Sequence, residues 1–142
     1  AKNRIQEAIC HDKRKEGLMK ENMIRVLKIE PEQVPAIKEI QNDLASLQAE
    51  VGGLIECISF PNGCVVVCNE EGKLRGMQPN RRLGADIICG PFFVCDTTYD
   101  GDFISLSKSK IAEFSQIFSE IPAFSGQEPE LEPGITFIGF DY

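Results

Sequence analysis

Short apolar runs separated by turn residues predict mainly β structure in the first two thirds of the chain. Residues 23–29 (MIRVLKI) alternate in the way of a strand with one strongly apolar face. The Glu-Pro-Glu sequence at 30–32 ends this strand, since proline donates no ladder hydrogen bond. A second strand is expected at 34–40, and Pro35 places it at a sheet edge. The two strands are predicted to pair as a hairpin.

Residues 54–77 are predicted to form an antiparallel meander. The apolar runs 54–60 and 64–68 flank a Pro-Asn-Gly sequence, which is typical of a hairpin turn. The Asn-Glu-Glu-Gly sequence at 69–72 has similar turn chemistry, so a third, short strand is expected at 73–77.

The next apolar run is interrupted by a glycine and a proline. Residues 78–85 are polar and are predicted to form a loop, and 86–95 is expected to be one long strand. Gly90 and Pro91 imply a bend or bulge in that strand. A brief strand is expected at 103–106.

Two segments carry helical periodicity, and they complete an α+β fold. Asn42 or Asp43 can cap a helix over 44–51, which the glycine pair at 52–53 ends. Ser107 is expected to cap the second helix, 108–121, whose apolar side chains recur at helical spacing. We therefore predict a curved, mainly antiparallel sheet of about six or seven strands with both helices packed on it.

The predicted domain covers residues 23–121 of the 142. Residues 1–22 form a charged extension that is expected to be helical. Residues 122–142 combine an acidic linker with an apolar segment at 135–140. This segment is expected to add an edge strand to its own sheet, or alternatively to pair with another copy and so form an oligomer.

Charge is unevenly distributed and bears on the class of partner. The chain has a net charge of −7, and residues 1–22 hold six Lys/Arg and four Asp/Glu, so the remainder carries −9. Because nucleic-acid binding needs clustered cations, a nucleic-acid partner is disfavoured and a protein partner is favoured. No apolar run approaches the roughly 20 residues of a membrane helix, and no apolar leader is present, so we expect a cytoplasmic protein without membrane contact.

The six cysteines are expected to be reduced side chains, mostly in the core. Disulfides and a metal site are the alternatives. A zinc site is disfavoured because the chain has no CxxC pair and a single histidine, His11. We expect no metal and no cofactor.

The sequence contains no familiar catalytic motif, and we expect no catalytic residues. The alternative is an enzyme with a carboxylate base, for which Glu70, Glu71 and Asp86 are the candidates. The two glutamates lie in a predicted turn and are expected to point to solvent.

Three groups are candidate binding residues. The first is Glu70 and Glu71, because the acidic turn shares one end of the sheet with the arginine loop if the strands 64–68 and 87–95 are neighbours. Asn80, Arg81 and Arg82 lie in the predicted loop, where an arginine pair can hold a carboxylate or phosphate. The alternative is that these arginines pair with the acidic turn at 69–72 or with Asp86. Phe92 and Phe93 are expected on opposite faces of a bulged strand, and an exposed ring would offer a partner surface.

Several motifs occur in a fixed order: MIRVLKIEP, DLASLQAEVGGLIE, NEEGKLRG, PNRR, DIICGPFFV and FISLS. In this respect the chain resembles a bacterial domain-of-unknown-function family that is frequent on plasmids, conjugative elements and phages of Gram-positive anaerobes. The resemblance runs from about residue 23 to 118 and carries over no activity. It implies genomic association with small accessory proteins of mobile DNA. We therefore expect a non-enzymatic accessory protein of a mobile element that binds a protein and interferes with a host component. The alternative is a protein that binds a small anionic nucleotide or metabolite through Arg81 and Arg82.

Overall fold

A computed structural model describes residues 22–132 of the chain. The predicted helical extension at the N-terminus and the apolar segment 135–140 lie outside the described residues. The described strands are β1 (Met23–Ile29), β2 (Ala36–Gln41), β3 (Ile55–Ser59), β4 (Cys64–Asn69), β5 (Pro79–Leu83), β6 (Asp86–Cys89), β7 (Phe92–Thr97) and β8 (Phe103–Ile104). The described helices are α2 (Leu44–Val51), α3 (Lys108–Ile117) and the short 3₁₀ helix η2 (Pro129–Leu131).

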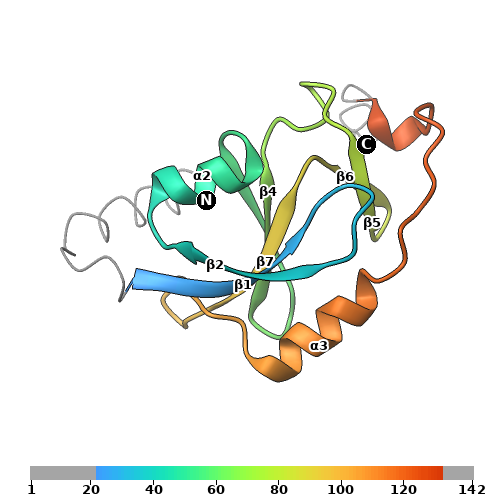
Figure 1. The fold of residues 1–142 in the computed structure, drawn as a ribbon. Helices are drawn as coiled ribbons and strands as arrows, with labels where there is room; N and C mark the ends of the chain where they lie inside the picture. Colours follow the sequence, from blue (N-terminus) through green and yellow to red (C-terminus); the bar gives the residue numbers. More distant parts are fainter. Residues whose placement is uncertain (1–21, 133–142) are drawn as a thin grey trace.

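Within these residues, six strands form one antiparallel sheet in the order β2-β1-β7-β4-β3, with β8 paired to β7. The remaining two, β5 and β6, form a separate hairpin. Helices α2 and α3 lie on opposite sides of the large sheet (Figure 1). The α+β class and the mainly antiparallel sheet are thus as predicted, as is the β1–β2 hairpin with β2 at an edge.

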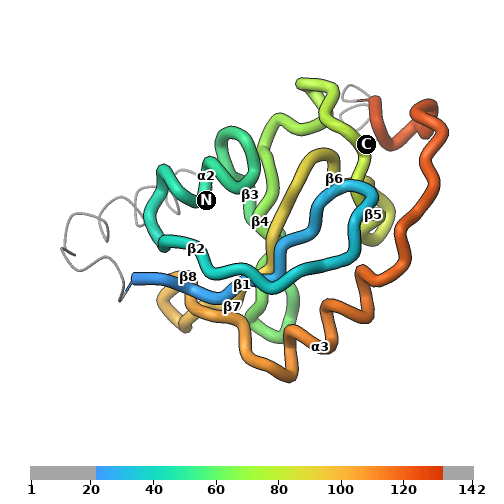
Figure 2. Tube along the Cα trace, viewed as in Figure 1, coloured from blue at the N-terminus to red at the C-terminus, as the bar shows by residue number. Residues whose placement is uncertain are grey.

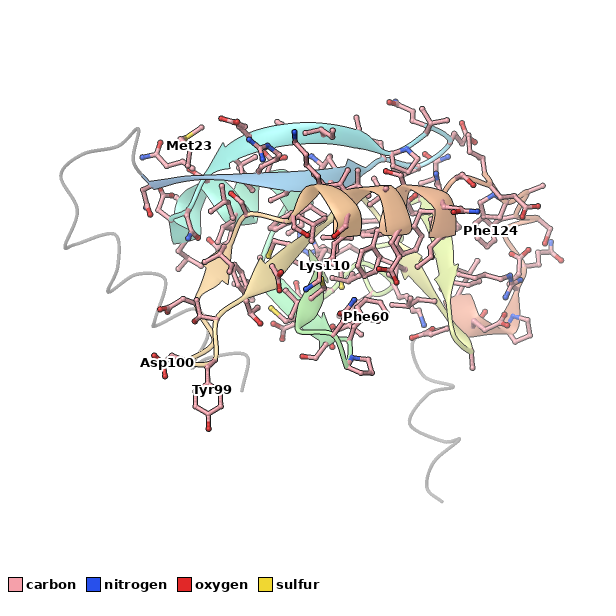
Figure 3. All side chains as sticks on the ribbon, turned by 90° about the horizontal axis from the view of Figure 1, so that it is seen from below. Met23, Phe60, Tyr99, Asp100, Lys110 and Phe124 are labelled. Atoms are coloured by element: carbon pink, nitrogen blue, oxygen red, sulfur yellow. The ribbon has the colours of Figure 1, made fainter. Side chains whose placement is uncertain are left out.

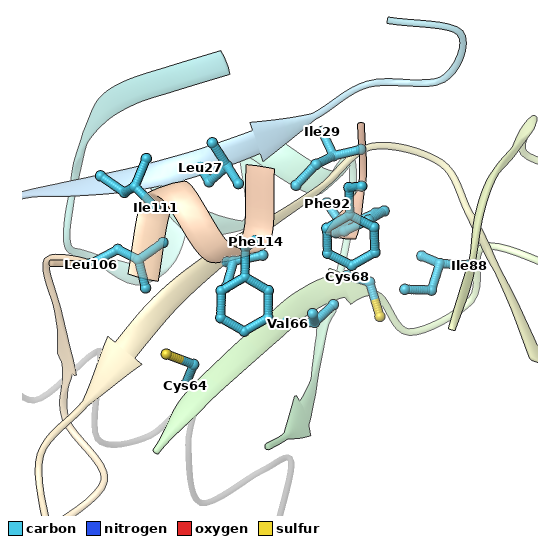
Figure 4. Close-up of a cluster of buried hydrophobic side chains, with 12 residues drawn as sticks. Leu27, Ile29, Cys64, Val66, Cys68, Ile88, Phe92, Leu106, Ile111 and Phe114 are labelled. Carbon is cyan, nitrogen blue, oxygen red and sulfur yellow. The ribbon is translucent and has the colours of Figure 1, made fainter. Parts of the chain in front are cut away.

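The sheet separates two hydrophobic clusters because successive side chains of a strand point to opposite faces. One cluster lies under α2 and includes Leu47, Val51 and Phe93. The other lies under α3 and includes Phe92 and Phe114 (Figure 4). Ile88 of β6 belongs to this second cluster, so the β5–β6 hairpin shares the α3 face of the sheet.

Local capping fixes the start of each helix. The Asp43 carboxylate accepts a hydrogen bond from the Ser46 N–H at 2.8 Å, and the Ser107 hydroxyl accepts one from the Lys110 N–H at 3.3 Å. Lys110 also anchors α3 to the sheet, since its ammonium donates to Asp96 at 3.0 Å and to the Asn62 carbonyl at 3.1 Å (Figure 3).

Helix α3 ends at Ile117, four residues before the predicted end. Phe118 leaves the helix and its ring packs edge-on against Phe92, with centroids 5.3 Å apart. The Phe118 carbonyl accepts a hydrogen bond from Arg81 at 3.1 Å. The predicted end was wrong because apolar residues recur at helical spacing up to residue 121, whereas the tertiary contacts of Phe118 end the helix at Ile117.

The predictions for residues 73–85 are wrong in both parts. Residues 70–76 form consecutive turns rather than a strand, closed by hydrogen bonds from Arg75 N–H to Glu71 O and from Met77 N–H to Gly72 O, both 2.9 Å. The predicted loop contains strand β5 instead. The meander therefore holds for β3 and β4 only.

The apolar run 86–95 is divided between the two sheets at Gly90 and Pro91. Gly90 has a φ of +88°, which favours glycine, and its N–H donates to the Gln78 carbonyl at 2.7 Å. Strand β6 therefore pairs with β5, whereas β7 crosses into the large sheet. After α3 the chain runs past this hairpin to η2 (Figure 2). No helix within residues 22–132 is long and apolar enough to cross a membrane.

Candidate functional site

A cleft of about 520 Å³ lies between the β3–β4 side of the large sheet, the turns at 70–74 and strand β6. Its walls come from segments that are distant in the sequence. The lining residues are Glu56, Ile58, Cys68, Asn69, Glu70, Glu71, Gly72, Lys73, Leu74, Asp86, Ile87, Ile88 and Cys89.

Negative charge predominates in this lining. Four carboxylates, those of Glu56, Glu70, Glu71 and Asp86, face a single ammonium among the lining residues, that of Lys73. Lys73 forms an ion pair with Asp86. The cleft therefore has a formal charge of −3, and it favours cationic ligands over anionic ones.

The cleft has an apolar, sulfur-bearing floor. Cys68, Ile88 and Cys89 are all buried. Burial raises the pKa of the Cys89 thiol, with a smaller opposing effect of Lys73, so this thiol is protonated at neutral pH. Among the described residues, no group of three or more His, Cys, Asp and Glu side chains is arranged to hold a metal ion.

Asn69 and Gly72 hold the acidic turn in place. The Asn69 side chain accepts the Glu71 N–H at 2.7 Å and donates to the Val51 carbonyl at 3.1 Å. A Cβ atom on Gly72 would stand 2.5 Å from the Cys89 carbonyl oxygen. The turn thus packs directly on β6, at a distance that only glycine permits, and both residues of this contact line the cleft.

The predicted arginine group does not join the acidic turn. Arg81 lies in β5 and is only 2% exposed. Its guanidinium donates to the carbonyls of Gln33 at 2.6 Å and Phe118 at 3.1 Å, and to both Asn80 oxygens. Burial lowers the pKa of Arg81. The expectation of an available arginine loop is therefore wrong for Arg81, because carbonyl oxygens already occupy its donors.

Asn80 and Arg82 also have structural partners. The buried Asn80 amide donates to the Ile29 and Gly90 carbonyls, both at 2.9 Å, and so ties the hairpin to the large sheet. Arg82 pairs with Glu130 at 3.2 Å and lies 5.6 Å from the centroid of the Phe124 ring. Of the acidic groups predicted to pair with these arginines, Glu71 pairs with Arg75 at 3.0 Å and Asp86 pairs with Lys73.

Phe92 and Phe93 face opposite sides of the sheet, as expected, but both rings are fully buried. The alternative of an exposed aromatic partner surface is therefore wrong. Of the predicted binding residues, only Glu70 and Glu71 line the cleft, together with Asp86, which was a candidate base. The sequence analysis did not identify Glu56 or Lys73 as site residues. It named Asp86 only as a candidate base of an alternative enzyme and as a possible partner of the arginines. The signal for Glu56 was a lone charge within the apolar run LIECISF.

Comparison with known proteins gives a family but no activity. No curated protein and no solved structure was found to match the chain. A family model described as "Domain of unknown function (DUF3846)" matches residues 24–119, which include both sheets apart from Met23, helices α2 and α3, and the whole lining of the cleft. The chain therefore belongs to this family of domains of unknown function.

Proposed function

We propose that this protein is a non-catalytic binding protein whose acidic cleft takes up a basic segment of a protein partner. The observation that carries the proposal is the excess of carboxylates over cations in a cleft with an apolar floor. Lysine and arginine side chains match both features, since their charged ends seek carboxylates and their aliphatic stems cover apolar surface.

The surroundings of the carboxylates favour binding over catalysis. The Asp86 side chain is 60% exposed and paired with Lys73, and Glu71 pairs with Arg75 near the surface. A carboxylate that acts as a general acid or base at neutral pH is instead expected in a desolvated setting that raises its pKa. The neutral Cys89 thiol is likewise a poor nucleophile.

The other candidate ligands find less support. An anionic nucleotide or metabolite needs free arginine donors, and those of Arg81 are bonded to carbonyls. Nucleic acid would bring its phosphates towards the acidic cleft. We also propose that the protein acts for a mobile element and interferes with a host component. The family resemblance is the one observation that supports this part of the proposal. A survey of the genes that flank family members tests that part.

Binding of a tetralysine peptide to the full-length protein, with tetraglutamate as the matched control, tests the proposal. We expect tetralysine alone to bind, and more weakly as salt concentration rises. The double variant Glu56→Gln/Glu70→Gln removes two of the four cleft carboxylates. At about 0.2–1 kcal/mol for each exposed pair, it should weaken binding about two- to thirtyfold.

Glu39→Gln is the control variant, because Glu39 is exposed on β2 at the opposite edge of the sheet. It should leave the affinity for tetralysine unchanged. Equal binding of tetralysine by the double variant and the unaltered protein would contradict the proposal.

A further inference from the structure

We propose that the partner's basic segment binds as an extended strand that pairs with the free edge of β3 and directs alternate side chains into the acidic cleft. This inference rests on the proposed function and specifies how the partner is held. It is carried by three features of β3: backbone groups that no described strand pairs, an edge sequence without proline or lysine, and the position of its side chains beside the cleft.

No strand within residues 22–132 pairs with one edge of the β3 backbone. In the part of the chain that the structure describes, β3 is the last strand of the sheet, next to β4. Hydrogen bonds from Phe60 N–H to Cys64 O and from Glu70 N–H to Leu54 O, both 2.8 Å, fix which residues bond to β4. Because bonding alternates along an antiparallel strand, the N–H and C=O groups of Cys57 and Ser59 point away from β4.

The two edges of the sheet differ in their protection against strand addition. Strand β2, at one edge, follows Pro35 and exposes Lys38 and Glu39, which are devices that discourage pairing. Strand β3, at the other edge, has the sequence IECIS, with no proline and with Glu56 as its one charge. The β3 edge is therefore open to an extended segment, and its one charge favours a basic partner.

The side chains of β3 determine which side chains of an added strand would lie beside the cleft. Ile55 and Cys57 pack with the cluster under α2, whereas Glu56 and Ile58 line the cleft on the other face. An added strand has the same alternation, so every second residue lies beside Glu56 and Ile58. Lysine or arginine at those positions would face the cleft carboxylates, whose formal charge together with Lys73 is −3.

This charge selects a basic segment over a second copy of the chain. Pairing of β3 with the β3 strand of another copy would place two acidic clefts next to each other, and like charges oppose such an interface. A basic segment gains main-chain hydrogen bonds from the edge and charge complementarity from the cleft, which is the usual division of roles in strand addition.

A peptide with alternating lysine and threonine, acetyl-KTKTKTK-amide, is the probe for the full-length protein. All its lysine side chains lie on one face of a strand, so all its lysine N–H groups point to one edge and all its threonine N–H groups to the other. We expect N-methylation of one of these two sets to weaken binding at least tenfold, through the loss of several hydrogen bonds. N-methylation of the other set should change the affinity less than threefold.

Two measurements on the protein complete the test. Ser59→Pro removes a donor on the free edge and no bond to β4, so it should weaken probe binding, whereas Ser59→Ala should not. Cys57 is the one free cysteine among the described residues that is only partly buried. Burial raises the pKa of the Cys57 thiol to about 12, so its alkylation is slow at neutral pH and needs long exposure to the reagent. Bound probe should slow this alkylation further, as followed by peptide-resolved mass spectrometry.

The outcomes separate this inference from the proposed function. If both N-methylated peptides bind as well as the unmodified probe, strand addition is refuted, and the acidic cleft stands provided that Glu56→Gln/Glu70→Gln still weakens binding. If tetralysine binds and the alternating probe does not, strand addition is likewise refuted and the acidic cleft stands. If neither peptide binds, both proposals fall. The peptide results decide the matter even if Ser59→Pro does not fold.

Discussion

Arg81 is a buried cation bonded to carbonyl oxygens, and its replacement by methionine should strongly destabilise the protein. The side chain is 2% exposed, and its partners within the described residues are carbonyls rather than carboxylates. The Phe118 carbonyl lies just beyond the C-terminus of α3, where the helix dipole favours a positive charge. Methionine keeps most of the apolar volume and removes every donor.

The magnitude follows from the two hydrogen bonds that join Arg81 to other elements. These run to the Gln33 carbonyl between β1 and β2 and to the Phe118 carbonyl after α3. Each hydrogen bond from a charged donor contributes about 1.5–3 kcal/mol, so their loss costs about 3–6 kcal/mol. Removal of a buried charge offsets part of this cost, and we expect a net loss near the lower limit, about 3 kcal/mol.

Urea unfolding followed by circular dichroism measures this loss. With a slope of about 2 kcal/mol per molar urea, the midpoint should fall by about 1.5 M. The adjacent Arg82→Met is the matched control. Its side chain is 49% exposed and keeps one ion pair with Glu130, so it should cost less than about 1 kcal/mol. A loss for Arg81→Met that is no larger than that for Arg82→Met would show that Arg81 does not stabilise the fold in this way.

Two further predictions concern the cleft turn and acid stability. Gly72→Ala should cost about 2 kcal/mol or more and weaken tetralysine binding, because its Cβ would meet a β6 carbonyl oxygen at 2.5 Å. Gly76→Ala, which meets no atom within 4 Å but has a φ of +69°, should cost about 1 kcal/mol and leave binding intact; urea unfolding and peptide titration would reveal any reversal of this order. Burial raises the pKa of Glu50, but hydrogen bonds from Lys28 and Lys38 outweigh this and lower it below 4.5. The unfolded chain therefore binds this proton at a higher pH, and stability should fall as pH drops from about 4.5 through the lowered pKa. Glu50→Gln should flatten that fall in urea unfolding at pH 3–6, and an unchanged pH profile would argue against this role of Glu50.

The elements that sequence reasoning predicted well are those with local signals. The β1–β2 hairpin, the cap at Asp43 and the left-handed Gly52 depend on residues within a few positions of each other. Strand β5 has no such signal. Its buried members Asn80 and Arg81 are polar, and the partners that tie them to other elements, the Ile29, Phe118 and Gln33 carbonyls, lie 37 to 51 residues away, so hydrophobic periodicity favoured a loop.

The candidate site was harder to predict than the fold because it depends on how strands are arranged. Glu56, Glu70 and Asp86 belong to three separate segments, and no spacing in the sequence shows that they share a cleft. The arginine pair, in contrast, suggested a binding site that the structure does not contain in the predicted form. It is conspicuous in the sequence, yet its two side chains point to different partners, Arg81 to carbonyls and Arg82 to Glu130.

The two-residue link at Gly90 and Pro91 makes the width of the cleft depend on chain length. Strand β6 ends at Cys89 and β7 begins at Phe92, so one wall of the cleft is joined to the large sheet by two residues. One extra residue in this link would either shift β6 or β7 by one residue, which moves each of its side chains to the other face, or leave β6 less firmly held against the large sheet. Variation in family members is therefore better accommodated elsewhere, and engineered changes of ligand should replace side chains here rather than alter the number of residues.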